Sequence, residues 1–331
     1  MEVANTPLID KYKRHLNYLR ISITDRCNLK CLYCMPSGPA YKMDHDEILR
    51  YEEILRIVRI GIRLGISKVR ITGGEPLVRK DCCDFLDALT RLRGLTDISL
   101  TTNGVLLPEY IGRIVSTGIK RLNISLDTLD SKKYAEITGV DAFDRVWQGI
   151  EAAYENGINP IKINVVVLNG INDDELADLA ALSFQYPFHI RFIEYMPIGR
   201  TRQCDKAPLL YPQIRSRVER LGELLPVSSQ TNDGPAVRYK FKAAIGEIGF
   251  ISAVSHHFCK QCNRLRLTAD GRIRACLLSD IHEDIKTPLR NGRLDTDLAE
   301  VFFRAVNRKP FQHAAKLDPH DINSQMISIG G

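Results

Sequence analysis

The feature that most constrains the fold is one repeated unit, in which a short strand-like run is followed by a helix-like stretch. Apolar or β-branched runs occupy residues 19–24, 68–72, 97–102, 120–126, 161–168 and 189–195. The gaps carry apolar residues at helical spacing, as in the stretch that begins at Glu52. In residues 139–157, Asp141 is a helix start signal and Gly157 is a stop signal. Six such units predict a parallel sheet whose right-handed crossovers place the helices on one side.

The number of units distinguishes a closed sheet from an open one. A complete eight-stranded TIM barrel takes about 250 residues. Six units within about 200 residues therefore predict an α/β fold with a partial TIM-type barrel, open along one side. An open doubly wound sheet is the structural alternative. In both folds, ligands bind at the C-terminal ends of the strands.

The last third of the chain has a different character. Glycines and turn residues become frequent from about Asn232, and residues 264–277 read as a hairpin with Asp270 and Gly271 in its turn. Two helical patterns and an irregular tail follow. We therefore predict two domains, a barrel over residues 10–230 and a smaller α+β domain over 231–331.

The amino-acid composition indicates which ligands and which cellular compartment suit this protein. Lys and Arg outnumber Asp and Glu by 46 to 40, a mild excess that fits an anionic small molecule, and no block of like charges predicts a nucleic-acid face. Neither a secretory signal nor a membrane-spanning run is evident, so we expect a cytoplasmic protein. The nine cysteines are then not expected to form disulfides. Whether the protein is a monomer or a homodimer stays open.

Three cysteines, Cys27, Cys31 and Cys34, directly follow the first strand-like run. Thiolates at this spacing can converge on one soft metal centre. A structural zinc site closes with four ligands, and no further Cys or His follows until His45. An iron–sulfur cube normally takes four cysteines, so a cube held by three keeps one iron open for a substrate. Zinc and a set of reactive thiols are the alternatives.

A second cysteine trio lies in the last third, at Cys259, Cys262 and Cys276. The predicted hairpin would bring Cys276 back towards Cys262. Zinc is a stronger alternative here, because His256 or His257 could complete a tetrahedral site. The remaining cysteines are expected to be ordinary thiols: Cys82, Cys83 and Cys204.

Polar or glycine-rich residues follow most of the other runs. They are Gly73–Pro76, Thr101–Gly104, Ser125–Asp127 and Tyr195–Pro197. Each has an ordinary explanation as a turn or as packing, but parallel strands would place them on one rim. Arg264 and Arg266 are two residues apart in a predicted strand, so their side chains point to the same side. Two guanidinium groups at one place suit a phosphate-bearing ligand. The alternative is that both arginines lie on a solvated face of the hairpin.

Two of these motifs resemble those of the radical S-adenosylmethionine superfamily. The stretch "CNLKCLYC" resembles its Cys-x3-Cys-x2-Cys signature and "GGEP" its second motif, over residues 10–230. The resemblance implies a partial (β/α)6 barrel and a [4Fe–4S] cluster whose open iron binds S-adenosylmethionine. It also implies an external electron donor, whose electron cleaves that cofactor into methionine and a 5′-deoxyadenosyl radical.

Over nearly the whole chain, the sequence resembles the GTP 3′,8-cyclases, lyases of molybdenum cofactor biosynthesis. The matching stretches include "CNLKCLYCMP", "VRITGGEPLVRKD", "NISLDTLD", "EYMPIG" and "FCKQCNRLRLTADGRIRACL". The resemblance implies a second [4Fe–4S] cluster on the second trio, with the purine of GTP on its open iron. The product would be 3′,8-cyclo-7,8-dihydroguanosine triphosphate, passed to the cyclic pyranopterin monophosphate synthase.

The same resemblance assigns roles to individual residues. It places the cofactor on Tyr33, Gly74, Ser125 and Met196. It places GTP on Arg20, Arg70, Thr101, Lys162, Arg264 and Arg266, where Lys162 would have to reach the site from inside the barrel. It implies catalytic roles for Arg264, Arg266, Gly330 and Gly331.

The terminal glycine pair has two interpretations. A free end is the ordinary expectation. The apolar "MISI" before it instead favours docking, and the family resemblance implies a tail that reaches the active site.

Two other function classes stay open. A different radical enzyme with an auxiliary cluster, such as a peptide maturase, would carry more C-terminal cysteines. The other class is a non-enzymatic module that binds zinc and an iron–sulfur cluster. In such a module the polar residues at the rim would have no function.

Overall fold

One twelve-stranded sheet forms the centre of the protein. The computed structural model describes residues 6–35, 42–196, 198, 207–228, 234–312, 322 and 326–330. The six predicted runs form strands β1 (Tyr18–Ser22), β2 (Lys68–Thr72), β3 (Asp97–Thr102), β4 (Leu122–Ser125), β5 (Ile161–Val167) and β6 (His189–Glu194). Each pairs with the next in parallel. The prediction of an α/β fold with a large parallel sheet is therefore confirmed.

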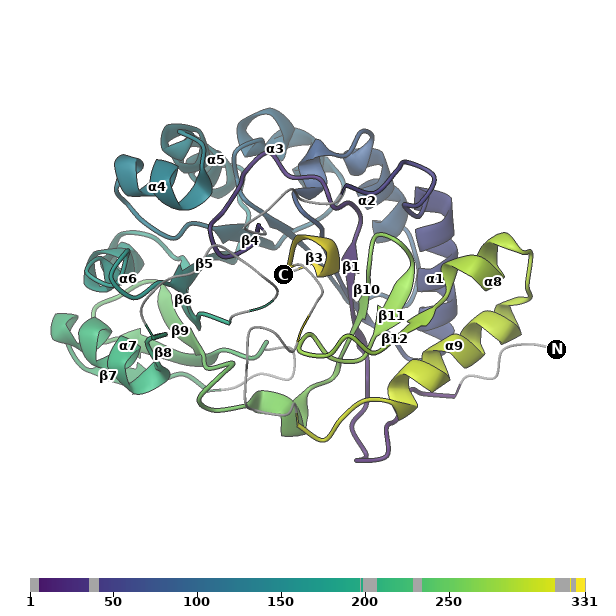
Figure 1. Ribbon diagram of the computed structural model, residues 1–331. Coiled ribbons are helices and arrows are strands. Elements are labelled where there is room, and N and C mark those ends of the chain that lie inside the picture. The colour runs from purple at the N-terminus through teal and green to yellow at the C-terminus, as the bar shows by residue number, and fades with distance from the viewer. Residues whose placement is uncertain are drawn as a thin grey trace.

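Helices cover the outer face of these strands (Figure 1). They are α1 (Tyr51–Arg63), α2 (Cys82–Thr90), α3 (Leu107–Ser116), α4 (Ser131–Thr138), α5 (Phe143–Glu155), α6 (Leu176–Gln185) and α7 (Tyr211–Val218), with short 3-10 turns η1 (Pro76–Val78) and η2 (Glu219–Leu221). The N-cap of α5 is Ala142 rather than the start signal Asp141. Gly157 follows the helix with a φ of 76°, as its stop signal indicates.

The two faces of each parallel strand differ in character because successive side chains point to opposite sides. In β1, Leu19 and Ile21 are fully buried in the hydrophobic core under the helices. Tyr18 and Arg20 point the other way and line an internal cavity. The apolar core therefore lies between sheet and helices, and the concave side of the sheet is left for polar chemistry.

The last third of the chain extends the same sheet at both ends. Its strands are β7 (Leu224–Pro226), β8 (Val237–Phe241), β9 (Glu247–Ile251), β10 (Arg264–Leu267), β11 (Arg272–Arg274) and β12 (His282–Asp284), and the order is β12-β11-β10-β1-β2-β3-β4-β5-β6-β9-β8-β7. β9 runs parallel to β6 and β10 runs parallel to β1. The connection 252–263, with the 3-10 turn η3 (Phe258–Gln261), therefore links the two ends of the parallel arc. Strands on both sides of residue 230 share one sheet, and the two-domain division stays a prediction.

The predicted hairpin is present as β10 and β11, with Arg266 opposite Arg274. Gly271 in its turn has a φ of 78°. Helices α8 (Lys286–Arg290) and α9 (Asp295–Asn307) follow, and α9 packs beside α1.

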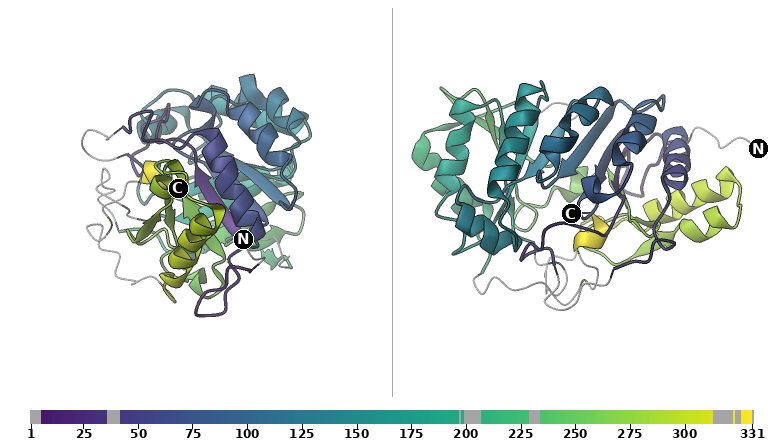
Figure 2. Two further views of the ribbon diagram at one scale, coloured as in Figure 1. Left: turned by 90° about the vertical axis from the view of Figure 1, so that its right-hand side faces the viewer. Right: turned by 90° about the horizontal axis from the view of Figure 1, so that it is seen from above.

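The short C-terminal helix α10 (Met326–Ile329) lies on the side of the strands opposite to helices α1–α7 (Figure 2, yellow). Within the described ranges, no helix is long and apolar enough to cross a membrane.

Candidate active site

A cavity of about 310 Å³ lies on the concave side of the sheet. Its walls come from the inward side chains of the parallel strands, from the loop after β1 and from the connection 252–263. All six cysteines of the two trios line it: Cys27, Cys31, Cys34, Cys259, Cys262 and Cys276. Residues far apart in the sequence therefore share one chamber, as the rim interpretation predicts.

The loop that carries the first trio is held against the glycine pair after β2. Gly74 N–H donates to Thr24 O at 2.7 Å, and Glu75 N–H donates to Arg26 O at 2.8 Å. A Cβ on Gly74 would lie 2.3 Å from Arg26 O, so only glycine permits this approach. The glycine pair thus sets the distance between the cysteine loop and β2.

Donor groups are directed at the sulfur of Cys27. Leu29 N–H lies 3.4 Å from Cys27 Sγ, and Asn103 Nδ2 lies 3.7 Å from it. Burial raises the pKa of Cys27 to about 11 and that of Cys34 to about 12, and it holds the pKa of Cys31 well above its ordinary value. The thiols therefore need a positively charged centre to become thiolates.

Glu75, to which the sequence interpretation gave no role, connects two of the rim motifs, its own Gly73–Pro76 and Thr101–Gly104. Its fully buried carboxylate accepts hydrogen bonds from Leu77 N, Asn103 N and Thr102 Oγ1 at 2.7–3.1 Å. Burial raises its pKa to about 7 in spite of these bonds. Its place in the "GGEP" motif was the signal that could have identified it.

The hairpin brings the second trio together. Cys259 lies in η3, Cys262 ends that turn and Cys276 follows β11, and all three line the cavity. Burial opposes ionisation of Cys262, but Arg264 and Lys309 outweigh it and lower its pKa to about 6. Cys262 therefore lies in a more basic environment than the cysteines of the first trio, whereas burial raises the pKa of Cys276.

The two histidines that could complete a zinc site differ in position, because His257 lines the cavity and His256 does not. His256 Nδ1 lies 3.1 Å from Ser255 Oγ, and His257 Nδ1 lies 3.1 Å from Ala253 O. In the part of the chain that the structure describes, no three His, Cys, Asp or Glu side chains are arranged to hold a single metal ion.

Four arginines form a basic wall beside the second trio. Arg20 lies between Arg70 and Arg266 in the register of the sheet, and Arg264 is the register partner of Tyr18. Burial and the charge of Arg264 lower the pKa of Arg266 to about 9. Burial, Arg266 and Arg70 likewise hold the pKa of Arg20 well below its ordinary value. Such crowding of buried cations favours an anionic ligand.

The cofactor residues proposed from the resemblance line the same chamber. Tyr33, Gly74, Ser125 and Met196 all line the cavity. Tyr33 Oη donates to Asp127 Oδ2 at 2.7 Å, and Val166 N donates to Asp127 Oδ1 at 2.8 Å. Burial raises the pKa of Asp127 to about 6.

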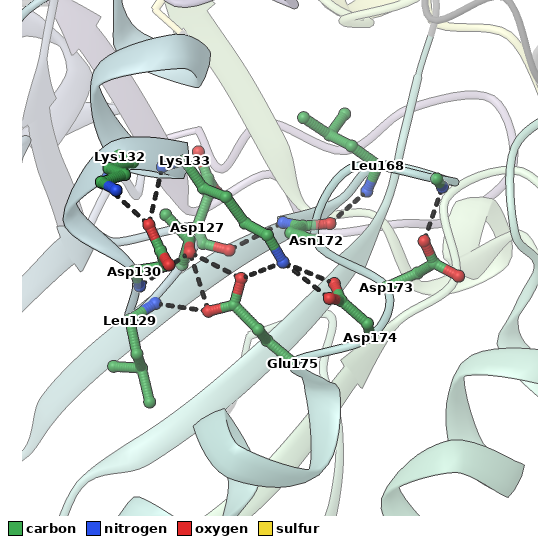
Figure 3. A network of polar contacts seen from close by, with 12 residues as sticks. Asp127, Leu129, Asp130, Lys132, Lys133, Leu168, Asn172, Asp173, Asp174 and Glu175 are labelled. Carbon is green, nitrogen blue, oxygen red and sulfur yellow. Dashed lines mark hydrogen bonds and ion pairs between the residues drawn. The ribbon is translucent and has the colours of Figure 1, made fainter.

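A polar network holds the loop behind Asp127 (Figure 3). Asn172, which is fully buried, donates to Asp127 O at 2.7 Å and accepts from Leu168 N at 2.8 Å. Glu175 accepts from Leu129 N at 2.8 Å and pairs with Lys133. Asp127 belongs to the rim stretch Ser125–Asp127 of the sequence analysis, but Asn172 and Glu175 were not predicted, because their contacts join segments that are distant in the sequence.

The remaining GTP candidates separate into two groups. Thr101 lines the cavity, and its Oγ1 is buried with no hydrogen-bond partner among the described residues. Lys162 is buried between Asn123 and His189 in register but does not line the cavity. Its role in binding stays a prediction.

Of the cysteines expected to be ordinary thiols, Cys82 and Cys83 lie in the hydrophobic core, and Cys204 falls outside the described residues.

The C-terminal tail reaches the basic wall. Gly330 is buried, and its carbonyl oxygen accepts a hydrogen bond of 2.6 Å from Arg266 Nη1. Ile329 packs in a small apolar cluster with Ile198 and Ile322. Gly331 lies outside the described residues.

Comparisons with known proteins agree with this geometry. Residues 21–182 match the Radical SAM superfamily, and residues 188–315 match the family Molybdenum Cofactor Synthesis C. The chain is 47% identical over 308 residues to the GTP 3′,8-cyclase of Heliobacterium modesticaldum, covering 92% of this chain and 94% of that protein. It is 46% identical over 327 residues to the GTP 3′,8-cyclase of Thermodesulfovibrio yellowstonii, covering 97% and 99%.

Among solved structures, Streptococcus suis SuiB has a similar fold, with a TM-score of 0.63 and 18% identity over 88% of this chain and 67% of that one. The identity to the cyclases over almost their full length, together with the two family matches, establishes the relationship. The chain belongs to the GTP 3′,8-cyclase family of the radical S-adenosylmethionine superfamily.

Proposed function

We propose that this protein is a lyase that converts GTP to 3′,8-cyclo-7,8-dihydroguanosine triphosphate in molybdenum cofactor biosynthesis. In this reaction the ribose C3′–H bond breaks, with its hydrogen leaving in 5′-deoxyadenosine, and C3′ becomes bonded to C8 of the guanine. The C8=N7 double bond becomes a single bond, and N7 gains a proton together with one electron from the external donor. The observation that carries the proposal is the shared chamber, which is lined by both cysteine trios and by the four arginines of the basic wall. Family membership supports the same conclusion.

The first trio fits a [4Fe–4S] cluster with one open iron. Three thiols and no fourth cysteine follow β1, and N–H donors already point at Cys27 Sγ. Such donors are a common means of tuning a cluster. When bound, this cluster and S-adenosylmethionine supply the carbon radical that starts the reaction. Tyr33, Gly74, Ser125 and Met196 would hold the cofactor, with Tyr33 fixed by Asp127.

The second trio is proposed to hold a second [4Fe–4S] cluster rather than zinc. Cys259, Cys262 and Cys276 line the same cavity, and among the described residues no three His, Cys, Asp or Glu side chains are arranged to hold a single metal ion. An open position at this cluster would face the space that the arginines surround, where a purine nucleotide can bind.

The basic wall is proposed to bind GTP. Arg20, Arg70, Arg264 and Arg266 contribute forked donors, and Thr101 contributes a hydroxyl that has no other described partner. Lys162 would contribute charge from deeper in the barrel. Gly330, held by Arg266, and Gly331 after it would close the site from the tail.

The protein would require an external electron donor and would pass its product to the cyclic pyranopterin monophosphate synthase. Anaerobic incubation with S-adenosylmethionine, a reductant and each nucleoside triphosphate in turn tests the activity. We expect GTP alone to be converted, with release of 5′-deoxyadenosine. Cofactor cleavage without conversion of any nucleotide would contradict the proposal and favour a radical enzyme that acts on another substrate, such as a peptide.

A further inference from the structure

A lysine outside both cysteine motifs lies directly against the second trio. Lys309 follows α9, and its backbone N–H donates to Val306 O at 3.0 Å. The residue is only 2% exposed, although lysine is almost never fully buried unless its charge has a partner. Such burial requires an explanation in terms of the groups that surround the ammonium.

The three N–H donors of the Lys309 ammonium face three acceptors on neighbouring residues. It lies 2.8 Å from Arg264 O, 2.6 Å from Ala275 O and 3.5 Å from Cys262 Sγ. Arg264 begins β10 and Ala275 follows β11, so the two carbonyls lie on the two strands of the hairpin at its open end. Lys309 therefore bridges the strands at the point where Cys262 and Cys276 enter the chamber.

The surrounding charges favour a negative centre at this point. Arg264 and Arg14 are the cations that act on the same region, and Cys262 and Cys276 are the groups that attract the ammonium. The ammonium thus lies where a negative charge on the sulfur of Cys262 would compensate it, beside the two carbonyl oxygens.

A second buried cation fixes the backbone next to Lys309. Arg14 is paired with Asp10 at 2.6 Å, and its guanidinium donates to Cys259 O at 2.6 Å, to Pro310 O at 2.7 Å and to Phe311 O at 3.1 Å. The segment that carries Lys309 is therefore tied to the segment that carries Cys259. The position of the ammonium relative to the trio is set from both sides.

We propose that Lys309 is a positioning residue of the second cluster, which fixes the hairpin at Cys262 and supplies the positive charge that makes the cluster easier to reduce. This inference rests on the proposed function, because it requires the second trio to hold iron. The reduction potential of a cluster depends on net charge, on hydrogen bonds to its sulfurs and on exposure. Reduction adds negative charge, so a buried cation beside a ligand sulfur stabilises the reduced form.

The test compares three substitutions of one side chain in the full-length, reconstituted protein. Lys309→Gln keeps amide donors for the two carbonyls but has no charge, Lys309→Met has neither, and Lys309→Arg keeps both. Lys260→Gln is the matched control, because Lys260 lies in η3 between Cys259 and Cys262 but is exposed. The iron content and the midpoint potential of each cluster are measured by anaerobic titration followed by electron paramagnetic resonance. A variant without the first trio assigns the signals.

We expect Lys309→Gln and Lys309→Met to shift the midpoint potential of the second cluster to more negative values. The potential of the first cluster in the same molecules should not change, and Lys260→Gln should match the wild type. Loss of the second cluster from Lys309→Gln but not from Lys309→Arg also supports the proposal, because the charge then retains the cluster.

An unchanged second-cluster potential in Lys309→Gln overturns the inference and leaves the proposed function intact. Equal loss of the cluster from all three variants overturns it as well, because the side chain would then serve packing alone. A wild-type protein that holds only one cluster overturns the inference together with the second-cluster part of the proposed function.

Discussion

Arg266 Nη1 donates a hydrogen bond of 2.6 Å to the carbonyl oxygen of Gly330, which joins the inner face of β10 to the C-terminal tail. Both residues lie at the basic wall, and Gly330 sits against Thr72 at the end of β2. The tail is therefore part of the chamber rather than an appendage to it.

Substitution of Gly330 should displace the tail. Its φ is 70°, and a Cβ would lie 2.7 Å from Thr72 Cγ2. Gly330→Ala, or deletion of Gly330 and Gly331, is expected to lower GTP conversion roughly ten- to hundredfold, the value of a charge-assisted hydrogen bond of about 1.5–3 kcal/mol. Iron content should stay at the wild-type level. Gly118→Ala is the control, since Gly118 has a φ of 85° but no neighbour within 4 Å. Full conversion of GTP by both tail variants would show that the tail has no role in the reaction.

The hairpin arginines should matter for GTP more than for the cofactor. Arg264→Ala and Arg266→Ala each remove a guanidinium from the cavity, and we expect roughly ten- to hundredfold weaker GTP turnover, from about 1.5–3 kcal/mol per charge-assisted contact. Cofactor binding, measured by equilibrium dialysis, should change little. Arg272→Ala, on the exposed face of the same hairpin, is expected to behave as the wild type. Normal cyclisation by both cavity variants would contradict the assignment.

The two trios should have separable roles. Reconstituted protein is expected to contain about eight irons, and about four irons with one zinc would contradict a second cluster. Replacement of Cys27, Cys31 or Cys34 by alanine should abolish cleavage of S-adenosylmethionine. Replacement of Cys259, Cys262 or Cys276 should mainly impair GTP turnover. Cys83→Ala, in the hydrophobic core, should retain both clusters. Iron analysis with a cofactor-cleavage assay distinguishes the sets.

Glu75 should produce a pH dependence of stability in the metal-free protein. Its pKa is raised from 4.5 to about 7 by burial, so the folded state binds the proton more tightly than the unfolded state. Its contribution to the free energy of unfolding therefore falls as the pH rises from about 4.5 to about 7. Glu75→Gln should flatten the pH profile over this range in urea unfolding, whereas the exposed Glu223→Gln should follow the wild type. An identical profile in Glu75→Gln would show that the carboxylate does not titrate there.

Local patterns predicted the parallel strands and the rim, because period and turn signals act over a few residues. The runs at 68–72 and 97–102 coincide with β2 and β3. The pairing of β9 with β6 and of β10 with β1 was not predicted, because local sequence patterns do not indicate which distant strand is the partner. For the same reason Lys309, 47 residues after Cys262, gave no sign of its contact with that sulfur.

Strand β1 pairs with β10, with Tyr18 opposite Arg264, and this pairing affects how the chain folds during its synthesis. During synthesis, β1 is complete long before β10 exists, so one side of an apolar strand has unpaired backbone groups in the meantime. Such an open edge is a template for pairing with other chains, and contacts this distant in the sequence form slowly. Chains that end before residue 264 should therefore aggregate through β1, even with the first cysteine loop already in place.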